Sequence, residues 1–221
     1  MYKTETHLHT AEISGCAKIK ACEMVRLYHE AGYKTMFVTD HLNKHVFDYV
    51  GDLPWEDKVT IYLSGFYKAR EEGKLYGMNI LLGAEITFTD APNDYLVYGI
   101  TREFLNEHPE IYKMGIEEFH KIAHKHNLFV VQAHPFRDNI CFPTPQFVDG
   151  MEVYNSNPRH QDFSDKSEQC ANENNLYKTY GSDAHRLEDI GKSGVLSAEE
   201  IKSTEDYINL VKSGNMNMYK G

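Results

Sequence analysis

The chain has 221 residues, of which 41% are hydrophobic and 25% charged, so it can bury a substantial core, and we expect one domain spanning residues 1–221. Its formal net charge of −10 argues against a long non-specific nucleic-acid groove, because that kind of binding needs a basic surface. The four cysteines form no CxxC pair, and neither a leader peptide nor a membrane-length apolar run is visible. We therefore expect a cytoplasmic protein without a membrane span. The unusual count is 12 histidines.

The first half of the chain alternates strand-like and helix-like patterns. Short apolar or alternating runs predict strands over 2–9, 34–41, 78–88 and 94–100. Apolar residues at helical spacing predict helices over 17–32, which ends at Gly32, and over 54–77, which begins at Pro54.

The second half continues the alternation. We expect strands over 128–135, 150–155 and 176–185, and helices over 114–127, 162–175 and 203–215. Strands that alternate with helices indicate a parallel α/β sheet. About seven strands are compatible with an open sheet or with a closed barrel, and periodicity does not separate the two.

Metal-capable side chains follow several of these strands. His7 and His9 lie two residues apart, so both imidazoles face the same side of an extended segment. Further strands end in residues of the same kind: Asp40 and His41, Glu85, His134, Glu152, and Asp183 and His185. In parallel α/β proteins the carboxyl ends of the strands meet on one face, where ligands bind.

Each of these residues has an ordinary explanation when it is taken alone. An Asp or His after a strand is commonly a turn former or a helix cap, and an isolated HxH usually faces solvent. Several separate strands that all end in His, Asp or Glu are harder to explain by capping, because imidazole is a poor cap. Nitrogen and oxygen ligands without cysteine suit Zn²⁺, Mn²⁺ or Fe²⁺, and there are more of them than one zinc ion takes.

The ordered motifs HLHT, TDH, GAE, AHP and GSDAH resemble those of the PHP (polymerase and histidinol phosphatase) family over residues 7–185. The resemblance implies a distorted (β/α)₇ TIM-like barrel whose strand ends hold two or three divalent metal ions. It also implies hydrolysis of a phosphoester by a metal-activated hydroxide.

The resemblance assigns roles to individual residues. His7 and His9 share one metal with Glu85 and Asp183. Glu85 bridges to a second metal, which His134 also holds, and is counted among the catalytic residues with Asp40. A third metal takes His41 and His185, and Asp40 orients the ligands from outside.

Two positions depart from the family pattern. The turn after HLHT offers Ser14 and Gly15 where a ligand of the third metal is usual, so Glu12 is the nearest replacement. The second metal usually takes another histidine, and Asp94 stands at about that place as a carboxylate replacement. Both changes make the cluster more anionic, which favours harder ions such as Mn²⁺ or Fe²⁺.

Cationic side chains near the strand ends are candidates for holding phosphate. Arg137 follows His134 by three residues, and Arg159 follows the strand that carries Glu152. The alternative for each arginine is a surface salt bridge. His160 is the candidate general acid that protonates the leaving alkoxide.

His120 and His124 have the i, i+4 spacing of a helical zinc site, but Lys121 occupies the place of the HExxH glutamate. We therefore expect these two residues and His126 to lie on a solvated helix face.

The leading hypothesis is a phosphoesterase that acts on a small phosphorylated metabolite or nucleotide, with no membrane or extended nucleic acid as partner. A metal-dependent amidohydrolase is the first alternative, because such enzymes also place HxH after a first barrel strand. A barrel that keeps metal only for stability and acts as a binding module is the second.

Overall fold

The computed structural model describes residues 1–161 and 163–221. Its strands are β1 (Tyr2–Glu5), β2 (Tyr33–Val38), β3 (His41–Leu42), β4 (Asn79–Thr87), β5 (Asp94–Tyr98), β6 (Phe129–Gln132), β7 (Gly150–Asn155), β8 (Tyr177–Gly181), β9 (Ser193–Ser197) and β10 (Asn217–Lys220). They form one sheet in the order β10-β9-β1-β2-β4-β5-β6-β7-β8, with β3 paired to β4. The expected α/β architecture is confirmed.

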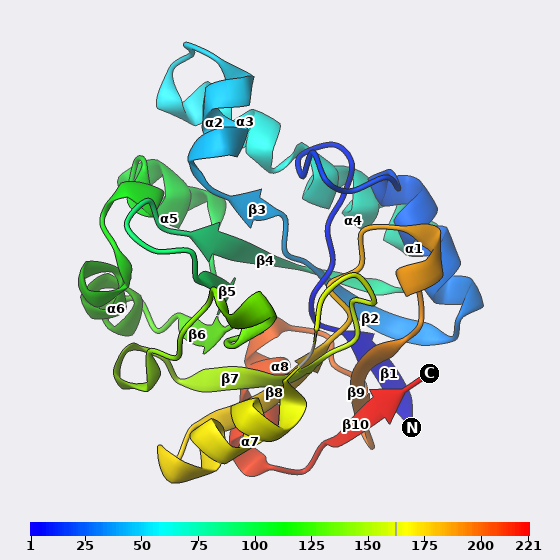
Figure 1. Cartoon of the computed structure of the whole chain (residues 1–221). Helices are drawn as coiled ribbons and strands as arrows, with labels where there is room; N and C mark the ends of the chain where they lie inside the picture. Colours follow the sequence, from blue (N-terminus) through cyan, green and yellow to red (C-terminus); the bar gives the residue numbers. More distant parts are fainter. Residues whose placement is uncertain (162) are drawn as a thin grey trace.

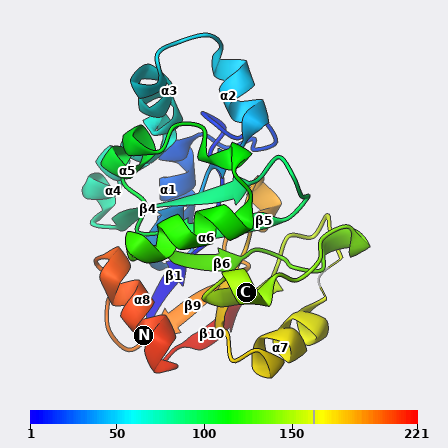
Figure 2. The same ribbon diagram turned by 90° about the vertical axis from the view of Figure 1, so that its left-hand side faces the viewer.

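The α-helices are α1 (Ala21–Glu30), α2 (Lys44–Val50), α3 (Trp55–Tyr62), α4 (Ser64–Tyr76), α5 (Arg102–Glu107), α6 (Ile116–Lys125), α7 (Ser164–Glu173) and α8 (Thr204–Ser213). Short 3₁₀ turns occur at Ile111–Lys113, Arg137–Asn139, Pro145–Phe147 and Leu187–Asp189. The helices surround the sheet, and Figure 2 shows α6 lying over β6.

The sheet curls into a nearly closed barrel (Figure 1). The path from β1 to β8 returns to its start, because Leu8 beyond β1 forms a parallel bridge with Ala184 beyond β8. The His9 N–H donates to the Ala184 carbonyl at 3.0 Å, and the Ala184 N–H donates to the His7 carbonyl at 3.3 Å. The open-sheet alternative is excluded, and the ends of β1 and β8 are joined at the segments that carry the predicted ligands.

Strand direction departs from the sequence expectation at one place. β5 runs antiparallel to both β4 and β6, whereas β1, β2 and β4 are mutually parallel, as are β6, β7 and β8. A parallel connection needs a crossover of a dozen or so residues. The segment 88–93 between β4 and β5 is too short for a crossover, so this pair forms a hairpin.

Two further segments differ from expectation. The helix expected over 54–77 is divided at Leu63 into α3 and α4, although the buried face continues through the break. The segment between the strand expected over 34–41 and the helix expected over 54–77 contains α2, where the Asn43 side chain accepts a hydrogen bond from the Val46 N–H at 3.0 Å. The strands β9 and β10 were not expected from the pattern.

The C-terminal helix matches its sequence signals. The Ser203 hydroxyl accepts from the Asp206 N–H at 3.1 Å, and Gly214 ends the helix with φ 69°. The helix expected over 162–175 is α7; its first expected residue, 162, lies outside the described residues. Tyr207 of α8 packs against Phe37 and Tyr98, with ring centroids 4.9 Å apart in both pairs.

Among residues 1–161 and 163–221, we find no helix of the length and apolar character that crossing a membrane requires.

Candidate metal centre

His7 and His9 lie just beyond β1 and flank Leu8. The Leu8 side chain is completely buried in the apolar cluster that α1 and α4 cover. Alternation along the extended segment turns the two imidazoles to the opposite side. Their Nε2 atoms are 3.2 Å apart, so the two rings converge as the spacing predicts.

Glu5, the last residue of β1, holds the backbone of this segment in place. Its Oε1 accepts from the N–H groups of Thr6 and His7 at 2.9 and 3.0 Å. Its Oε2 accepts from the hydroxyls of Tyr28 and Ser182 at 2.8 and 2.6 Å. Burial raises the pKa of Glu5 more than these hydrogen bonds lower it. Glu5 therefore acts on the histidine pair through the backbone.

Four side chains converge on one point: His7, His9, Glu85 and Asp183. His7 Nε2 lies 3.2 Å from Glu85 Oε1 and 3.5 Å from Asp183 Oδ1. His9 Nε2 lies 3.4 Å from Glu85 Oε2 and 3.2 Å from Asp183 Oδ1. Each of the two imidazole nitrogens therefore lies within 3.5 Å of an oxygen from both carboxylates. Two imidazoles and two carboxylates are a donor set that fits a divalent ion such as zinc.

The contact between Glu85 and His41 also fits a shared cation. Glu85 Oε2 and His41 Nδ1 are 2.7 Å apart and buried, yet within residues 1–161 and 163–221 neither atom has a well-aligned hydrogen-bond partner. A lone pair on the carboxylate oxygen and one on the imidazole nitrogen, both directed at the same cation, would bring the two atoms this close without the alignment of a hydrogen bond. Burial alone would raise the pKa of Glu85, but His7 and His41 lower it well below its usual value. Glu85 is therefore an anion inside the barrel.

Glu85 belongs to a second group with Asp94 and His134. His134 Nε2 lies 3.0 Å from Glu85 Oε1 and 3.8 Å from Asp94 Oδ2. Burial raises the pKa of Asp94, and the negative charge of Glu85 raises it further. Two carboxylates that repel each other across an imidazole form a favourable position for a cation.

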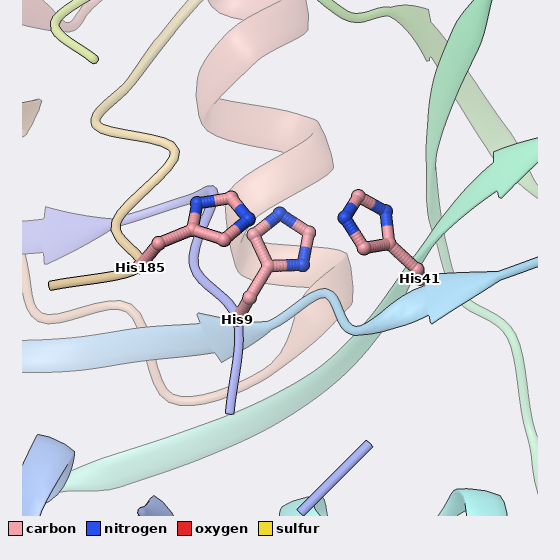
Figure 3. Close-up of side chains that lie close together, drawn as sticks. All are labelled: His9, His41 and His185. Carbon is pink, nitrogen blue, oxygen red and sulfur yellow. The ribbon is translucent and has the colours of Figure 1, made fainter. Parts of the chain in front are cut away.

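A third group contains His9, His41 and His185. Figure 3 shows the His9 ring between the other two, with centroids 4.2 Å from His41 and 4.3 Å from His185. The three residues follow β1, β2 and β8 respectively. Burial and the two neighbouring rings lower the pKa of His9 well below its usual value, so its imidazole is a neutral donor.

Most of these rings are oriented by an oxygen on their outer nitrogen. These partners are Glu152 Oε1 for His7 Nδ1 at 2.9 Å, Ser14 Oγ for His9 Nδ1 at 3.3 Å, and the Asp183 carbonyl for His185 Nδ1 at 2.8 Å. In each ring, Nε2 then faces the cluster. An outer partner of this kind fixes the tautomer and raises the basicity of a metal-binding imidazole.

Asp40 lies outside the three groups and holds the turn after His9. Its carboxylate accepts from the Thr10 N–H at 2.6 Å, the Thr10 hydroxyl at 2.7 Å and the Ser14 hydroxyl at 2.9 Å. Burial raises the pKa of Asp40 to about 6, although these hydrogen bonds lower it. The orienting role that the family resemblance implies for Asp40 stays a prediction.

The backbone is strained at two of the strand ends. His134 has φ 27° and Asp183 has φ 53°, both in the left-handed region that residues other than glycine rarely adopt. Each such residue costs about 1–3 kcal/mol and persists only where its surroundings impose it. This strain aims both side chains into the cluster.

The structure does not bring Glu12 or Arg159 to the cluster. Glu12 Oε2 accepts from the Ala21 N–H at 2.9 Å, at the start of α1, and its Oε1 lies 3.5 Å from Lys68 Nζ. Arg159 forms a bidentate pair with Asp189, at 2.8 and 2.7 Å. Both side chains are engaged in contacts that hold loops in place.

Arg137 and His160 line one small pocket beside His134. The Arg137 guanidinium pairs with Asp183, and among the residues that the structure describes its buried Nε has no hydrogen-bond partner. His160 Nδ1 lies 2.7 Å from Asp138 Oδ2 on the exposed side. Both residues lie at the edge of the predicted metal cluster.

Cys16 is a neighbour of the cluster that the sequence patterns did not indicate. Its Sγ lies 3.3 Å from His41 Nε2, and the thiol also hydrogen-bonds to His185. Burial raises the pKa of the thiol, but the hydrogen bonds to the two histidines outweigh it and lower the pKa to about 6. The signal in the sequence was the residue type. Cysteine is a common metal ligand, and Cys16 lies four residues after Glu12, which the sequence analysis had favoured as the replacement ligand.

The helical histidines lie away from this cluster. His124 is exposed, and His120 Nδ1 lies 3.0 Å from the Phe147 carbonyl. His126 forms a separate group with Glu107 and His108, in which the two Nε2 atoms are 3.4 Å apart. The expected solvated face therefore holds for His124, while His120 and His126 are partly buried by their neighbours.

No curated protein sequence matches the chain. A family model described as PHP-associated matches residues 163–216. A two-domain protein from Bacteroides vulgatus, said to contain a predicted PHP-like metal-dependent phosphoesterase, superposes with a TM-score of 0.71 and 17% identity. The alignment covers 99% of this chain and 64% of that one. The chain has the PHP fold.

Two other solved structures extend this likeness. A candidate metal-dependent phosphoesterase from Bifidobacterium adolescentis has a TM-score of 0.57 and 15% identity, and 96% of each chain is covered. The lesion-specific endonuclease EndoQ of Pyrococcus furiosus has a TM-score of 0.65 and 14% identity, with 98% of this chain and 57% of that one covered. At these identities the likeness establishes the fold alone.

Proposed function

We propose that the protein is a metal-dependent hydrolase that cleaves phosphoesters of a small metabolite or nucleotide. The observation that carries the proposal is the position of Glu85. Its two oxygens lie 2.7–3.4 Å from nitrogens of His7, His9, His41 and His134. One buried carboxylate that contacts four imidazoles is suited to bridge metal ions, and bridged divalent ions are typical of phosphoester hydrolases.

The residues present fit two or three divalent ions. His7, His9, Glu85 and Asp183 would hold the first, Glu85 with His134 and Asp94 the second, and His41 with His185 the third. Ions in such a centre lower the pKa of bound water and neutralise negative charge that develops on phosphate oxygens.

Arg137 would bind the phosphate group. Its guanidinium pairs with Asp183 and lines the small pocket beside His134, so it lies next to the groups that would hold the metal ions. Asn157 Nδ2 donates to Asp183 Oδ2 at 3.2 Å, which keeps that carboxylate in place. A guanidinium fork matches two phosphate oxygens, so Arg137 would orient the ester beside the metal centre.

His160 would give a proton to the leaving alkoxide. It lines the same small pocket as Arg137 and His134, and Asp138 orients its ring through Nδ1. A histidine oriented by a carboxylate is a common general acid.

A small substrate is favoured over a polymer because the chain is acidic. The net charge of −10 opposes non-specific binding to nucleic acid. EndoQ shares the fold, but this chain spans 57% of its length. The proposal therefore concerns phosphomonoesters or small nucleotides.

The test is phosphate release from an aryl phosphate and from nucleoside monophosphates, with protein whose metal content has been measured. We expect turnover with Zn²⁺ or Mn²⁺ that chelation abolishes. Arg137→Ala should raise KM for the phosphoester by about tenfold or more, because a charged hydrogen bond to phosphate is lost. Arg186→Ala is the control, since it removes an exposed arginine that belongs to none of the three groups.

Metal-loaded protein that turns over no member of a broad phosphoester panel would overturn the proposal. Turnover of cyclic amides alone would favour the amidohydrolase alternative. A metal-dependent melting temperature without any turnover would favour the binding module.

A further inference from the structure

The turn between His9 and α1 is held at both ends, and this fixes the place of Cys16. Near its start, the Ser14 hydroxyl donates to Asp40 at 2.9 Å and accepts from the His41 N–H at 3.2 Å. Near its end, the Lys18 N–H donates to the His185 carbonyl at 2.8 Å. Cys16 is therefore clamped between the two loops that carry His41 and His185.

The thiol faces ring nitrogens of both histidines. Sγ lies 3.3 Å from His41 Nε2. His185 Nδ1 lies 2.8 Å from the Asp183 carbonyl, which leaves Nε2 as the nitrogen of His185 that can bind elsewhere. Sulfur and two imidazole nitrogens are a typical partial ligand set for zinc.

We propose that Cys16 is a thiolate ligand of the metal ion held by His41 and His185. The inference rests on the proposed metal centre. It gives Cys16 the ligand position of the third metal for which the sequence had indicated Glu12. Glu12 is engaged at the start of α1 and with Lys68, so it does not compete for this position. Binding replaces the thiol proton, which passes to solvent as the metal–sulfur bond forms.

This ligand changes the expected metal preference. From the sequence we expected harder ions such as Mn²⁺ or Fe²⁺, because Glu12 and Asp94 were placed as carboxylate replacements for the usual ligands. A thiolate with two imidazoles instead selects Zn²⁺ over Mn²⁺ at this position. The other two positions, which have only nitrogen and oxygen donors, carry no such preference.

The first test uses the unmodified protein. Cys16 and Cys22 are both exposed, and Cys22 lies on α1 outside the three metal groups. Iodoacetamide labelling of each cysteine is followed by peptide mass spectrometry before and after loading with zinc. We expect zinc to slow the labelling of Cys16 by about tenfold or more and to leave Cys22 unchanged, because a metal-bound thiolate is a poor nucleophile.

The second test uses Co²⁺ as a spectroscopic probe. A cobalt–thiolate bond gives an intense charge-transfer band in the near ultraviolet, which nitrogen and oxygen ligands do not give. We expect the band in the unmodified protein and in Cys22→Ser, and its loss in Cys16→Ser. A band that persists in Cys16→Ser would overturn the inference, as would zinc loading without protection of Cys16.

These outcomes are separable from those of the proposed function. Protein that binds metal and hydrolyses phosphoesters, yet leaves Cys16 unprotected, would refute only the thiolate ligand. Protein that shows the cobalt band but turns over no phosphoester would refute only the phosphoesterase.

Discussion

Two regions of the molecule gather histidines with carboxylates, and they differ in nearly everything else. At the barrel mouth, His7 and its neighbours are buried and come from separate strand ends. At the ends of α5 and α6, His108 and His126 are half-exposed, and Glu107 beside them faces solvent. Both regions place donor atoms within 4.8 Å of one another. Proximity alone therefore does not distinguish them.

The partners of each ring make the difference. At the mouth, Glu152 orients His7, and the Asp183 carbonyl orients His185. In the helical pair, both rings pack on Phe104, with centroids 4.6 and 5.2 Å away, and the closest polar contact joins the two rings. Oriented rings around buried anions suit cation binding, whereas an aromatic support suits packing.

The largest effect should come from Glu85→Gln. The substitution removes the charge that four histidines share, so we expect loss of bound metal and a fall in kcat/KM of about a thousandfold or more, the scale of losing a preorganised electrostatic group. Metal content by elemental analysis and steady-state kinetics measure this. His108→Ala in the helical region is the control, and equal metal loss in both variants would erase the contrast between the two regions.

The contrast between the regions was only partly readable from sequence. Strand-end residues such as His9, Glu85 and Asp183 met as expected, because the barrel joins strand ends whatever the details of side-chain packing. Cys16 could not be placed, since its position depends on a turn held by Ser14 and Lys18. Strand β5 was assigned the wrong direction, because alternation predicts a strand without stating which way it runs.

The outer contacts were the least readable part. Glu5 and Glu152 lie on β1 and β7. The apolar pattern of these segments predicts that each is a strand, but it does not predict what the two carboxylates contact. Their carboxylates are satisfied by backbone N–H groups and ring nitrogens that approach from other strands. A sequence shows such residues as polar positions in a strand, and only the fold reveals their partners.

Acidification should next separate the two regions. Burial and Arg137 lower the pKa of His134, but hydrogen bonds to Cys141 and Glu85 raise it to about 9 in the metal-free protein. Below that pH the ring carries a proton that metal must displace, so metal affinity should rise with pH by about tenfold per unit for each proton released. Calorimetry in buffers of different ionisation enthalpy counts these protons.

In the helical pair, the pKa of the histidine is shifted in the opposite direction. Burial and the neighbouring His126 lower the pKa of His108, so its ring is neutral near pH 7. We expect His108→Ala to leave the proton count unchanged. Metal uptake without proton release near pH 7 would contradict the assignment of His134 as a protonated group that metal displaces.

Glu152→Gln should have a smaller effect. Glu152 Oε1 contacts His7 Nδ1 at 2.9 Å, and its Oε2 accepts from the His134 N–H at 3.0 Å. The amide keeps the shape but removes the charge that holds the His7 tautomer, so we expect metal affinity to fall by about 10–100-fold. Competition with a chelator of known affinity measures the loss. Glu173→Gln, at the exposed end of α7, removes the same charge away from the cluster and is the matched control.

The smallest effect is expected for His108→Ala itself. The substitution removes one ring from the Phe104 contact and one weak hydrogen bond, so we expect a loss of about 0.5–1 kcal/mol in the free energy of unfolding. Metal stoichiometry and turnover should stay as in the unmodified protein, because in the part of the chain that the structure describes the pair lacks an oriented outer partner and a buried anion. Denaturant unfolding and elemental analysis measure the two quantities. Loss of one metal equivalent in this variant would show that two half-exposed imidazoles beside a carboxylate suffice for a site, and burial of the anion would then no longer explain why the barrel mouth differs.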